Sequence, residues 1–457
     1  MRPYVLPLPR PERSLLVRDA SFVVTERGVL KNKSVYIEGR RIREIGDIEA
    51  IRAKYGRWEE EIDATRKLVI PGLVNNHTHI AMTLLRGYAE DLPLLNWLRE
   101  KVWPAEAKLK PEDIYLGAVA GAAEVLLSGT TSITTAYFYD ERGSEAEALL
   151  DVGLRGIAAH GVFDWTRESA ALKTEEMVKR FHGADDGRIR SATAPHTPYT
   201  CSPDLLREIA GLRVSMNEKY GEKYPVMNTL HVAEANNEAM DIQEKYKVPV
   251  KKGVASYLDS LGVLNEFTIA AHCIHLTEDD IRAFRGSGAS VASCPVSNLK
   301  VGMGVADLPK LVSNGITVSL GTDGPASNNS LDMFETMKMA SLLPKGLQGD
   351  TTLMNSKQVF DVATLGGARS MKQDSEIGSI AIGKRADIVV MNLTNAHSFP
   401  FYDAFSHLAY SAKSHDVRDV ILDGRIIVRD RQLLSIEMEK LETEIESRVV
   451  SLGYKIP

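Results

Sequence analysis

The sequence predicts an α/β fold, a closed (β/α)8 TIM barrel joined to a small β-sandwich domain that is built from both chain ends. Residues 71–375 alternate strand-like apolar runs with helix-like segments, which is typical of a parallel sheet wrapped by helices. Short alternating strand patterns flank this middle part on both sides. A chain of 457 residues has room for one barrel and one smaller domain.

The first element, residues 1–70, contains short strands and turns. Apolar residues alternate in residues 14–17, 21–24 and 33–42, and the last run includes a Gly-Arg-Arg turn. This pattern predicts a small antiparallel sheet. It returns in residues 386–391 and 417–428. We therefore expect residues 1–70 and 376–457 to form one composite β-sandwich domain.

The second element, residues 71–375, contains eight strand candidates. Amphipathic stretches between them, such as residues 111–127 and 331–343, predict helices. Eight parallel strands favour a catalytic barrel in which the chemistry lies at the carboxyl ends of the strands. The candidate strands end near His79, Tyr139, Asp164, His196, His231, His272, Asn298 and Asp323. The last element, residues 436–452, has apolar residues at helical spacing and many glutamates, which predicts a C-terminal surface helix.

Composition excludes several classes of function. Hydrophobic residues make up 44% and charged residues 25%, and the net charge of -6 offers no basic field, so we expect no nucleic-acid partner. No run of 18 uncharged apolar residues occurs, and prolines interrupt the N-terminus, so we expect a cytoplasmic protein without membrane contact. Cys201, Cys273 and Cys294 have no CxxC spacing, which predicts buried thiols rather than a disulfide framework or a zinc ribbon.

The first strand of the middle part ends in His77-Thr78-His79. Side chains two residues apart in a strand point to the same face, so both imidazoles can bind one metal ion. A structural strand end remains an alternative for this pair alone, because the chain has 11 histidines.

Three further strand ends carry side chains that are candidates for metal binding or proton transfer. His231 ends an apolar run, and Glu234, three residues later, can approach whatever His231 binds without being a ligand. His272 ends another strand, whereas His275 is expected to make only a loop contact. Asp323 lies between glycines that permit close backbone approach, although an Asx-turn is the alternative for this residue alone.

Together, His77, His79, His231 and Asp323 offer three neutral imidazoles and one carboxylate. This set predicts one divalent metal ion with one position left for water. Zn2+ is the first expectation, and Fe2+ and Mn2+ are the alternatives.

These motifs resemble the amidohydrolase superfamily, and the resemblance covers most of the chain. Within it, the sequence is similar to the methylthioadenosine/S-adenosylhomocysteine deaminase group, near chlorohydrolases and guanine and cytosine deaminases. The supporting motifs are Leu94-Leu95-Asn96-Trp97-Leu98, Val102-Trp103-Pro104-Ala105-Glu106, Ala194-Pro195-His196-Thr197-Pro198-Tyr199 and Ser293-Cys294-Pro295-Val296-Ser297-Asn298-Leu299-Lys300. The resemblance and the tail helix favour a homo-oligomer, either a dimer or a tetramer.

The resemblance implies roles for five substrate-binding residues. Glu106 would bind the ribose hydroxyls, His196 a purine ring nitrogen, and Trp97 would cover the nucleoside. In relatives that accept S-adenosylhomocysteine, arginines after strand three meet the amino-acid carboxylate; here His160 occupies one such position, and Arg167 is the candidate for another. An imidazole does not reproduce a bidentate arginine contact, which favours the other adenine nucleosides.

The resemblance also implies a single metal. Superfamily members with two metals commonly bridge them through a carbamylated lysine at the end of strand four. That strand ends here at His196, and no lysine occurs between Lys179 and Lys219.

The implied enzyme is a hydrolase of C–N bonds in cyclic amidines. It would convert 5'-methylthioadenosine, adenosine, 5'-deoxyadenosine or S-adenosylhomocysteine to the inosine analogue and ammonia. Asp323 would take the proton of the attacking water, His272 would orient its oxygen, and Glu234 would protonate the purine ring. One alternative is a hydrolase of amino- or chloro-heterocycles, of the guanine deaminase, cytosine deaminase or triazine hydrolase type. A non-catalytic metal-holding scaffold is another, although it would need neither His272 nor Glu234.

Overall fold

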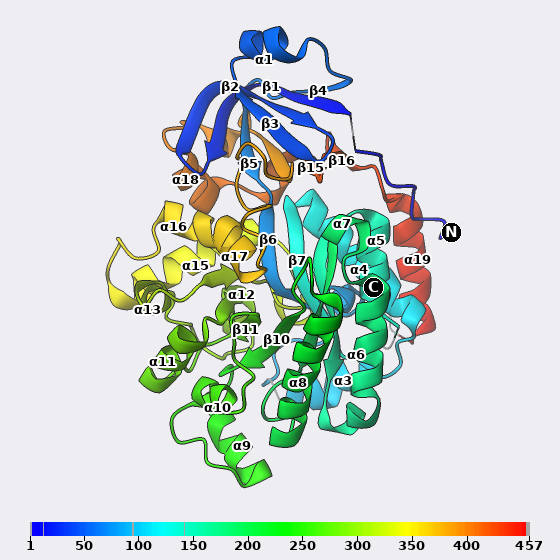
Figure 1. Ribbon diagram of the computed structural model, residues 1–457, viewed down its shortest axis with the longest axis vertical. Coiled ribbons are helices and arrows are strands. Elements are labelled where there is room, and N and C mark those ends of the chain that lie inside the picture. The colour runs from blue at the N-terminus through cyan, green and yellow to red at the C-terminus, as the bar shows by residue number, and fades with distance from the viewer. Residues whose placement is uncertain (1, 12, 94–95, 141, 454–457) are drawn as a thin grey trace.

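The computed structural model describes residues 2–11, 13–93, 96–140 and 142–453 (Figure 1). It contains an eight-stranded sheet and a separate nine-stranded sheet, and the predicted fold class is confirmed. The first sheet has the sequential order β13 to β6, and the pairs that join its neighbouring strands are parallel. Its strands are β6 (Leu73–Thr78), β7 (Thr130–Tyr137), β8 (Arg155–Val162), β9 (Ile189–Pro195), β10 (Met227–Val232), β11 (Thr268–His272), β12 (Ser290–Ser293) and β13 (Val318–Leu320).

The two end strands of this sheet, β6 and β13, lie beside each other, so the sheet curls into a nearly closed barrel. Just beyond β13, the backbone N–H of Asp323 donates to the carbonyl oxygen of His77 at 2.9 Å. All residues of the eight strands are buried. This explains why the strands consist mainly of apolar and small residues and do not alternate apolar with polar residues.

Helices surround the barrel (Figure 1). The stretch 111–127 forms α4 (Pro111–Leu127), as predicted. The stretch 331–343 corresponds to α15 (Met333–Gln348). This helix begins two residues later than predicted because the side chain of Asp332 caps it by accepting the N–H of Phe334. The other barrel helices of eight or more residues are α5 (Ser144–Val152), α6 (Arg167–Phe181), α8 (Pro203–Tyr220), α9 (Glu238–Tyr246) and α11 (Glu278–Ser287). Shorter helices α12 (Pro295–Lys300) and α14 (Pro325–Asn328) follow β12 and β13 directly.

The chain ends form the nine-stranded sheet. Its order is β17-β16-β15-β14-β5-β1-β2-β3, with β4 paired to β1. Strand β14 pairs with β5 antiparallel, and this pair joins the two ends of the chain. The strands are β1 (Ser14–Thr25), β2 (Gly28–Glu38), β3 (Arg41–Gly46), β4 (Glu60–Asp63), β5 (Lys67–Pro71), β14 (Ile388–Asn392), β15 (Val417–Leu422), β16 (Arg425–Arg429) and β17 (Gln432–Leu433).

The N-terminal part of this sheet is mixed, not purely antiparallel as the sequence predicts. Strands β1, β2 and β3 are antiparallel, but β4 and β5 pair with β1 in parallel. Helix α1 (Ile48–Tyr55) lies between β3 and β4, and such a crossover lets the chain return in the parallel direction.

A buried network of ion pairs lies where the nine-stranded sheet meets the barrel. Arg155, the first residue of β8, donates to Asp387 (2.9 Å) and to Asp423 (3.4 Å). Arg385 and Arg40 also pair with Asp423, each at 2.7 Å. The side chains of Arg155 and Asp423 are 1% and 0% exposed, so their charges are compensated by one another rather than by water.

The predicted C-terminal helix is α19 (Met438–Ser451), which lies beside α4 (Figure 1). Arg448 pairs with the buried Asp113 of α4 at 2.9 Å. In the described ranges, none of the helices is both long and apolar enough to span a bilayer.

Candidate active site

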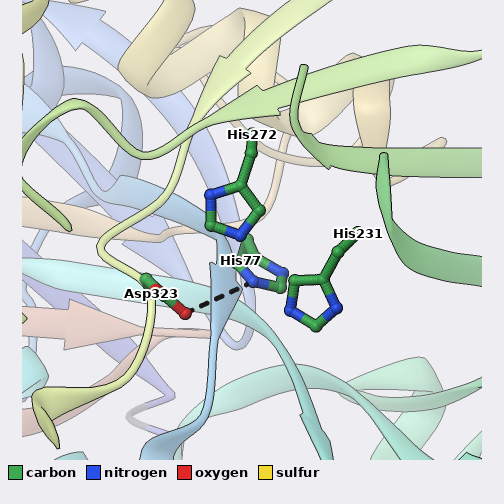
Figure 2. A group of neighbouring side chains, drawn as sticks. All are labelled: His77, His231, His272 and Asp323. Carbon is green, nitrogen blue, oxygen red and sulfur yellow. Dashed lines mark ion pairs between the residues drawn. The ribbon is translucent and has the colours of Figure 1, made fainter. Parts of the chain in front are cut away.

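Histidines and one aspartate from four strand ends meet at the carboxyl end of the barrel. His77 lies in β6, His231 in β10 and His272 at the end of β11, and Asp323 follows β13. Figure 2 shows these four side chains converging on one point. One potential ligand atom from each lies within 4.8 Å of the other three. His79 joins them, since its Nε2 atom lies 3.4 Å from Oδ1 of Asp323.

The hydrogen bonds of His79 and His231 determine which of their nitrogens carry protons. Nδ1 of His79 donates to the carbonyl oxygen of Ala136 (2.7 Å), and Nδ1 of His231 donates to that of His196 (2.8 Å). In the neutral rings both Nε2 atoms are therefore unprotonated. They face each other at 3.2 Å. Two opposed lone pairs repel unless a cation lies beside them, so this cluster fits a divalent metal ion.

Burial keeps these imidazoles neutral. It lowers the pKa of His77 to about 4 and also lowers the pKa values of His79 and His231. The Nε2 atom of His77 is buried and has no hydrogen-bond partner among the described residues. Neutral imidazoles with a free nitrogen are the form in which histidine binds zinc.

Asp323 presents one oxygen to the imidazoles. Oδ1 lies 3.5 Å from Nε2 of His77, whereas Oδ2 accepts the hydroxyl groups of Ser297 (2.6 Å) and Ser327 (2.7 Å). Burial opposes ionisation, but the surrounding histidines hold the pKa of Asp323 well below its usual range. The carboxylate is thus fixed for ligation through a single oxygen. The close approach around it depends on Gly321, where a Cβ atom would lie 2.8 Å from His77.

Ser297 and Ser327 are site residues that sequence reasoning missed. Each begins a Ser-Asn dipeptide, and these dipeptides lie in the helices that directly follow β12 and β13. In the first of them, Oδ1 of Asn298 accepts the Nδ1–H of His272 at 2.8 Å. The repetition of Ser-Asn after two neighbouring strands was the signal that could have found them.

Glu234 and His272 form the acid–base side of the site. Oε1 of Glu234 lies 3.8 Å from Nε2 of His272. Burial raises the pKa of Glu234; the His272 charge opposes this effect and the Asp323 charge adds to it. Burial alone would lower the pKa of His272, but the Glu234 and Asp323 carboxylates outweigh it and raise the pKa. The two groups are therefore coupled, and each shifts the pKa of the other.

The backbone at these positions is strained. Ala233, His272, Cys273 and Asp323 have φ angles of 50°, 66°, 51° and 61°, in the left-handed region that residues with a side chain rarely adopt. Such residues cluster where surrounding structure imposes a required geometry. Here they turn the chain sharply at the ends of β10, β11 and β13, which aims the side chains into the barrel mouth.

A cavity opens above the cluster at the barrel mouth. The predicted substrate-binding residues Trp97, Glu106 and His196 line it together with Glu234 and Asp323. Apolar side chains, Met82, Leu98, Trp103, Phe138 and Val301, form much of the remaining wall.

Glu106 is a buried carboxyl group in this wall. It is 1% exposed, and its Oε1 atom has no hydrogen-bond partner within the described chain. Burial raises its pKa to about 8, against a lowering by the neighbouring Tyr137. An unsatisfied acceptor that lines a cavity is available to a hydroxyl-bearing ligand.

The sequence model of the amidohydrolase family matches residues 68–427. The chain belongs to the amidohydrolase family. The resemblance that its motifs suggest is confirmed, as is the expectation of a hydrolase.

Three known proteins similar to this amidohydrolase are informative. A 5'-deoxyadenosine deaminase of Methanothermobacter thermautotrophicus is 42% identical, over 92% of this chain and 95% of its own. A 5-methylthioadenosine/S-adenosylhomocysteine deaminase of Thermoanaerobacter pseudethanolicus is 35% identical, over 96% and 99%. The zinc-bound crystal structure of an adenosine deaminase from Xanthomonas campestris superposes with a TM-score of 0.87 at 31% identity, covering 97% of this chain and 99% of the other.

Two residues proposed to contact substrate lie elsewhere in this amidohydrolase. His160 is 2% exposed in β8, its Nδ1 donates to the carbonyl oxygen of Asp140 (3.0 Å), and it does not line the cavity. Arg167 is half exposed at the start of α6 and pairs with Glu208 at 3.0 Å, also outside the cavity. The structure therefore places both side chains away from the cavity.

The remaining polar candidates have structural contacts. His275 bonds through Nε2 to the carbonyl oxygen of Met303 at 2.9 Å, which is the loop contact that the sequence predicts. Cys201, Cys273 and Cys294 are buried free thiols, as predicted. Burial raises the pKa of Cys201 to about 12, so at neutral pH it is not a thiolate nucleophile.

Proposed function

We propose that this amidohydrolase is a zinc-dependent adenine-nucleoside deaminase. It breaks the bond between the purine ring and its exocyclic amino group, forms a C–O bond from water, and releases ammonia and the inosine analogue. One observation carries the proposal: His79, His231 and Asp323 of the metal-binding cluster, the buried acid Glu234 and the buried Glu106 line the same cavity.

His77, His79, His231 and Asp323 would hold the single metal ion. The donor set of three neutral imidazoles and one carboxylate suits Zn2+, with Fe2+ and Mn2+ as the alternatives. When bound, the ion supplies Lewis acidity that lowers the pKa of a water ligand to about 7.

Two side chains supply the proton transfers, and a third orients the attacking water. Asp323 is ionised, so it can accept the proton of the attacking water. Burial raises the pKa of Glu234, which suits a general acid that protonates the ring nitrogen next to the reacting carbon and then assists the departing amine. His272 lies 3.8 Å from Glu234, and the neighbouring Glu234 and Asp323 carboxylates outweigh burial and raise its pKa, so it can orient the attacking oxygen through Nε2.

Glu106 favours a nucleoside over a bare heterocycle. Its Oε1 atom is buried without a hydrogen bond in the described chain, and the residue lines the cavity together with His79, His231 and Asp323. Ribose hydroxyls would satisfy it, whereas guanine, cytosine or a triazine offers no hydroxyl group. Trp97 and His196, which line the same cavity, would contact the sugar-bearing face and the purine ring.

The cavity wall also favours a small, uncharged 5' group. Among the described residues that line it there is no lysine or arginine, while Glu106, Glu234 and Asp323 are carboxyl groups. The amino-acid carboxylate of S-adenosylhomocysteine would find no cationic partner. We therefore favour 5'-deoxyadenosine and 5'-methylthioadenosine; the first is named in one similar enzyme, and the second is named together with S-adenosylhomocysteine in another.

The test is ammonia release by the zinc-loaded protein from 5'-deoxyadenosine, 5'-methylthioadenosine, adenosine, S-adenosylhomocysteine and guanine. Turnover of the first two at the highest kcat/KM supports the proposal. A higher kcat/KM for S-adenosylhomocysteine would reject the argument on the 5' group. Activity on guanine alone would favour the heterocycle hydrolase, and activity on none would reject the nucleoside deaminase.

A further inference from the structure

Two buried glutamates outside the cavity lining each accept a backbone N–H from a loop that carries site residues. Glu145 accepts the N–H of Ala81 at 3.1 Å, two residues after His79. Glu238 accepts the N–H of Glu234 itself at 2.8 Å. Both glutamates are only 1% exposed.

The turn that carries Glu234 is held from two sides. On one side, the carbonyl oxygen of Ala233 accepts the N–H groups of Ile274 and His275, both at 3.0 Å, which ties the turn to the loop after His272. On the other side lies Glu238, the first residue of α9, whose side chain reaches back over the turn. Because φ of Ala233 is 50°, the turn is strained and needs such restraints.

We propose that Glu238 is a positioning residue for Glu234: by accepting the Glu234 N–H, it fixes the turn that places the Glu234 carboxyl group 3.8 Å from His272. The proposal rests on the proposed function, in which Glu234 is the proton donor. Glu238 does not line the cavity and so acts without touching substrate.

The chemistry of Glu238 suggests a conservative variant. Burial raises its pKa to about 8, so the side chain is mainly neutral at pH 7. Glutamine has the same shape and charge and keeps an oxygen acceptor. Methionine fills a similar volume and offers no such acceptor. The pair Glu238→Gln and Glu238→Met therefore separates loss of the hydrogen bond from loss of packing.

The experiment is a double-mutant cycle between Glu238→Met and Glu234→Gln, read as kcat and KM for ammonia release at pH 7. Alone, Glu238→Met should lower kcat about 10²-fold, the cost typical of misplacing a catalytic group by 1 Å. In the Glu234→Gln background the further loss should be below about threefold, because the residue through which Glu238 acts is already disabled. KM and bound zinc should stay at the unmodified values, and Glu238→Gln should restore most of the rate.

Three results would each overturn the assignment. The first is an equal loss of kcat in the two backgrounds, the second is loss of zinc from Glu238→Met, and the third is a kcat of Glu238→Gln as low as that of Glu238→Met. If Glu238→Met does not fold, Glu238→Ala carries the same comparison. Glu145→Met is the matched control, since it releases the loop after His79 and should lower bound zinc instead. An unmodified protein that releases no ammonia would reject the proposed function and this assignment with it, whereas equal losses would reject only the role of Glu238.

Discussion

The Nε2 atoms of His79 and His231 lie 3.2 Å apart, and neither carries a proton, because each ring donates its Nδ1–H to a backbone carbonyl oxygen. Two unprotonated nitrogens cannot hydrogen-bond to each other. Their approach is favourable only with a cation beside them, so metal binding and the folded geometry of the barrel mouth are linked.

Removal of the metal should lower stability. A metal that binds only the folded state stabilises it by about 4 kcal/mol at a free concentration 1,000 times Kd. Chelation should therefore lower Tm of the unmodified protein and have little effect on His79→Ala, which should already have lost most of its zinc. His275→Ala is the control and should keep one zinc per chain, because the Nε2 atom of His275 bonds to the carbonyl oxygen of Met303. A full zinc complement in His79→Ala would remove His79 from the ligand set.

Glu234→Gln should keep its zinc and lose activity. General acid catalysis contributes about 10²–10⁴-fold, and an amide cannot supply that proton. The measurement is kcat for 5'-deoxyadenosine beside zinc content by mass spectrometry. A kcat within about threefold of the unmodified enzyme would contradict the role of Glu234.

Removing the hydroxyl groups that hold Asp323 should weaken metal binding. Groups that orient a metal ligand typically contribute about 10–100-fold in metal affinity or activity. Ser297→Ala and Ser327→Ala should each raise the zinc Kd, measured by competition with a chromophoric chelator. Because both donate to the same oxygen, the double variant should lose more than either single one. An unchanged Kd in the double variant would show that the ligand does not need them.

Nucleoside binding should tighten as the pH rises through 8. The pKa of Glu106 is raised to about 8 by burial, so below that pH it is a neutral acid and above it an anion. Hydrogen bonds to an ionised acceptor are about twice as strong as neutral ones, so KM for the nucleoside should fall between pH 7 and 9. Glu106→Gln should show a flat KM over this range. The opposite slope, or the same slope in Glu106→Gln, would assign the titration to another group.

Glu145 should make the zinc-free protein less stable at higher pH. Burial raises its folded-state pKa from an ordinary 4.5 to about 8, so the folded state binds the proton more tightly than the unfolded state does. Its stabilising effect is complete below pH 4.5 and is lost as the pH rises to 8, at about 1.4 kcal/mol per pH unit. Urea midpoints of the unmodified protein and of Glu145→Gln should therefore converge or cross between pH 5 and 8. Parallel curves would exclude a raised pKa.

Much of the fold could be predicted, because buried parallel strands give long apolar runs and each run here ends in a polar residue. His77, Glu234 and Asp323 were found in this way, since their positions depend on local strand ends. Ser297 and Glu238 were not found, because their contacts with Asp323 and with the Glu234 backbone depend on how separate loops pack. His160 was aligned to a substrate contact, but its contact with Asp140 cannot be inferred from strand pattern.

The ion pairs of Arg155 have a consequence for how the chain is made. Its partners Asp387 and Asp423 lie 232 and 268 residues later, so a ribosome adding about 5–20 residues per second delivers the second partner roughly 10–50 s after Arg155. During that interval the guanidinium of Arg155 lacks the two carboxylates that pair with it in the complete fold, and a chain that stops before Asp387 never acquires them. The buried ion-pair network can thus form only after Asp423 has been synthesised, and a fragment ending at residue 375 would lack both carboxylate partners of Arg155.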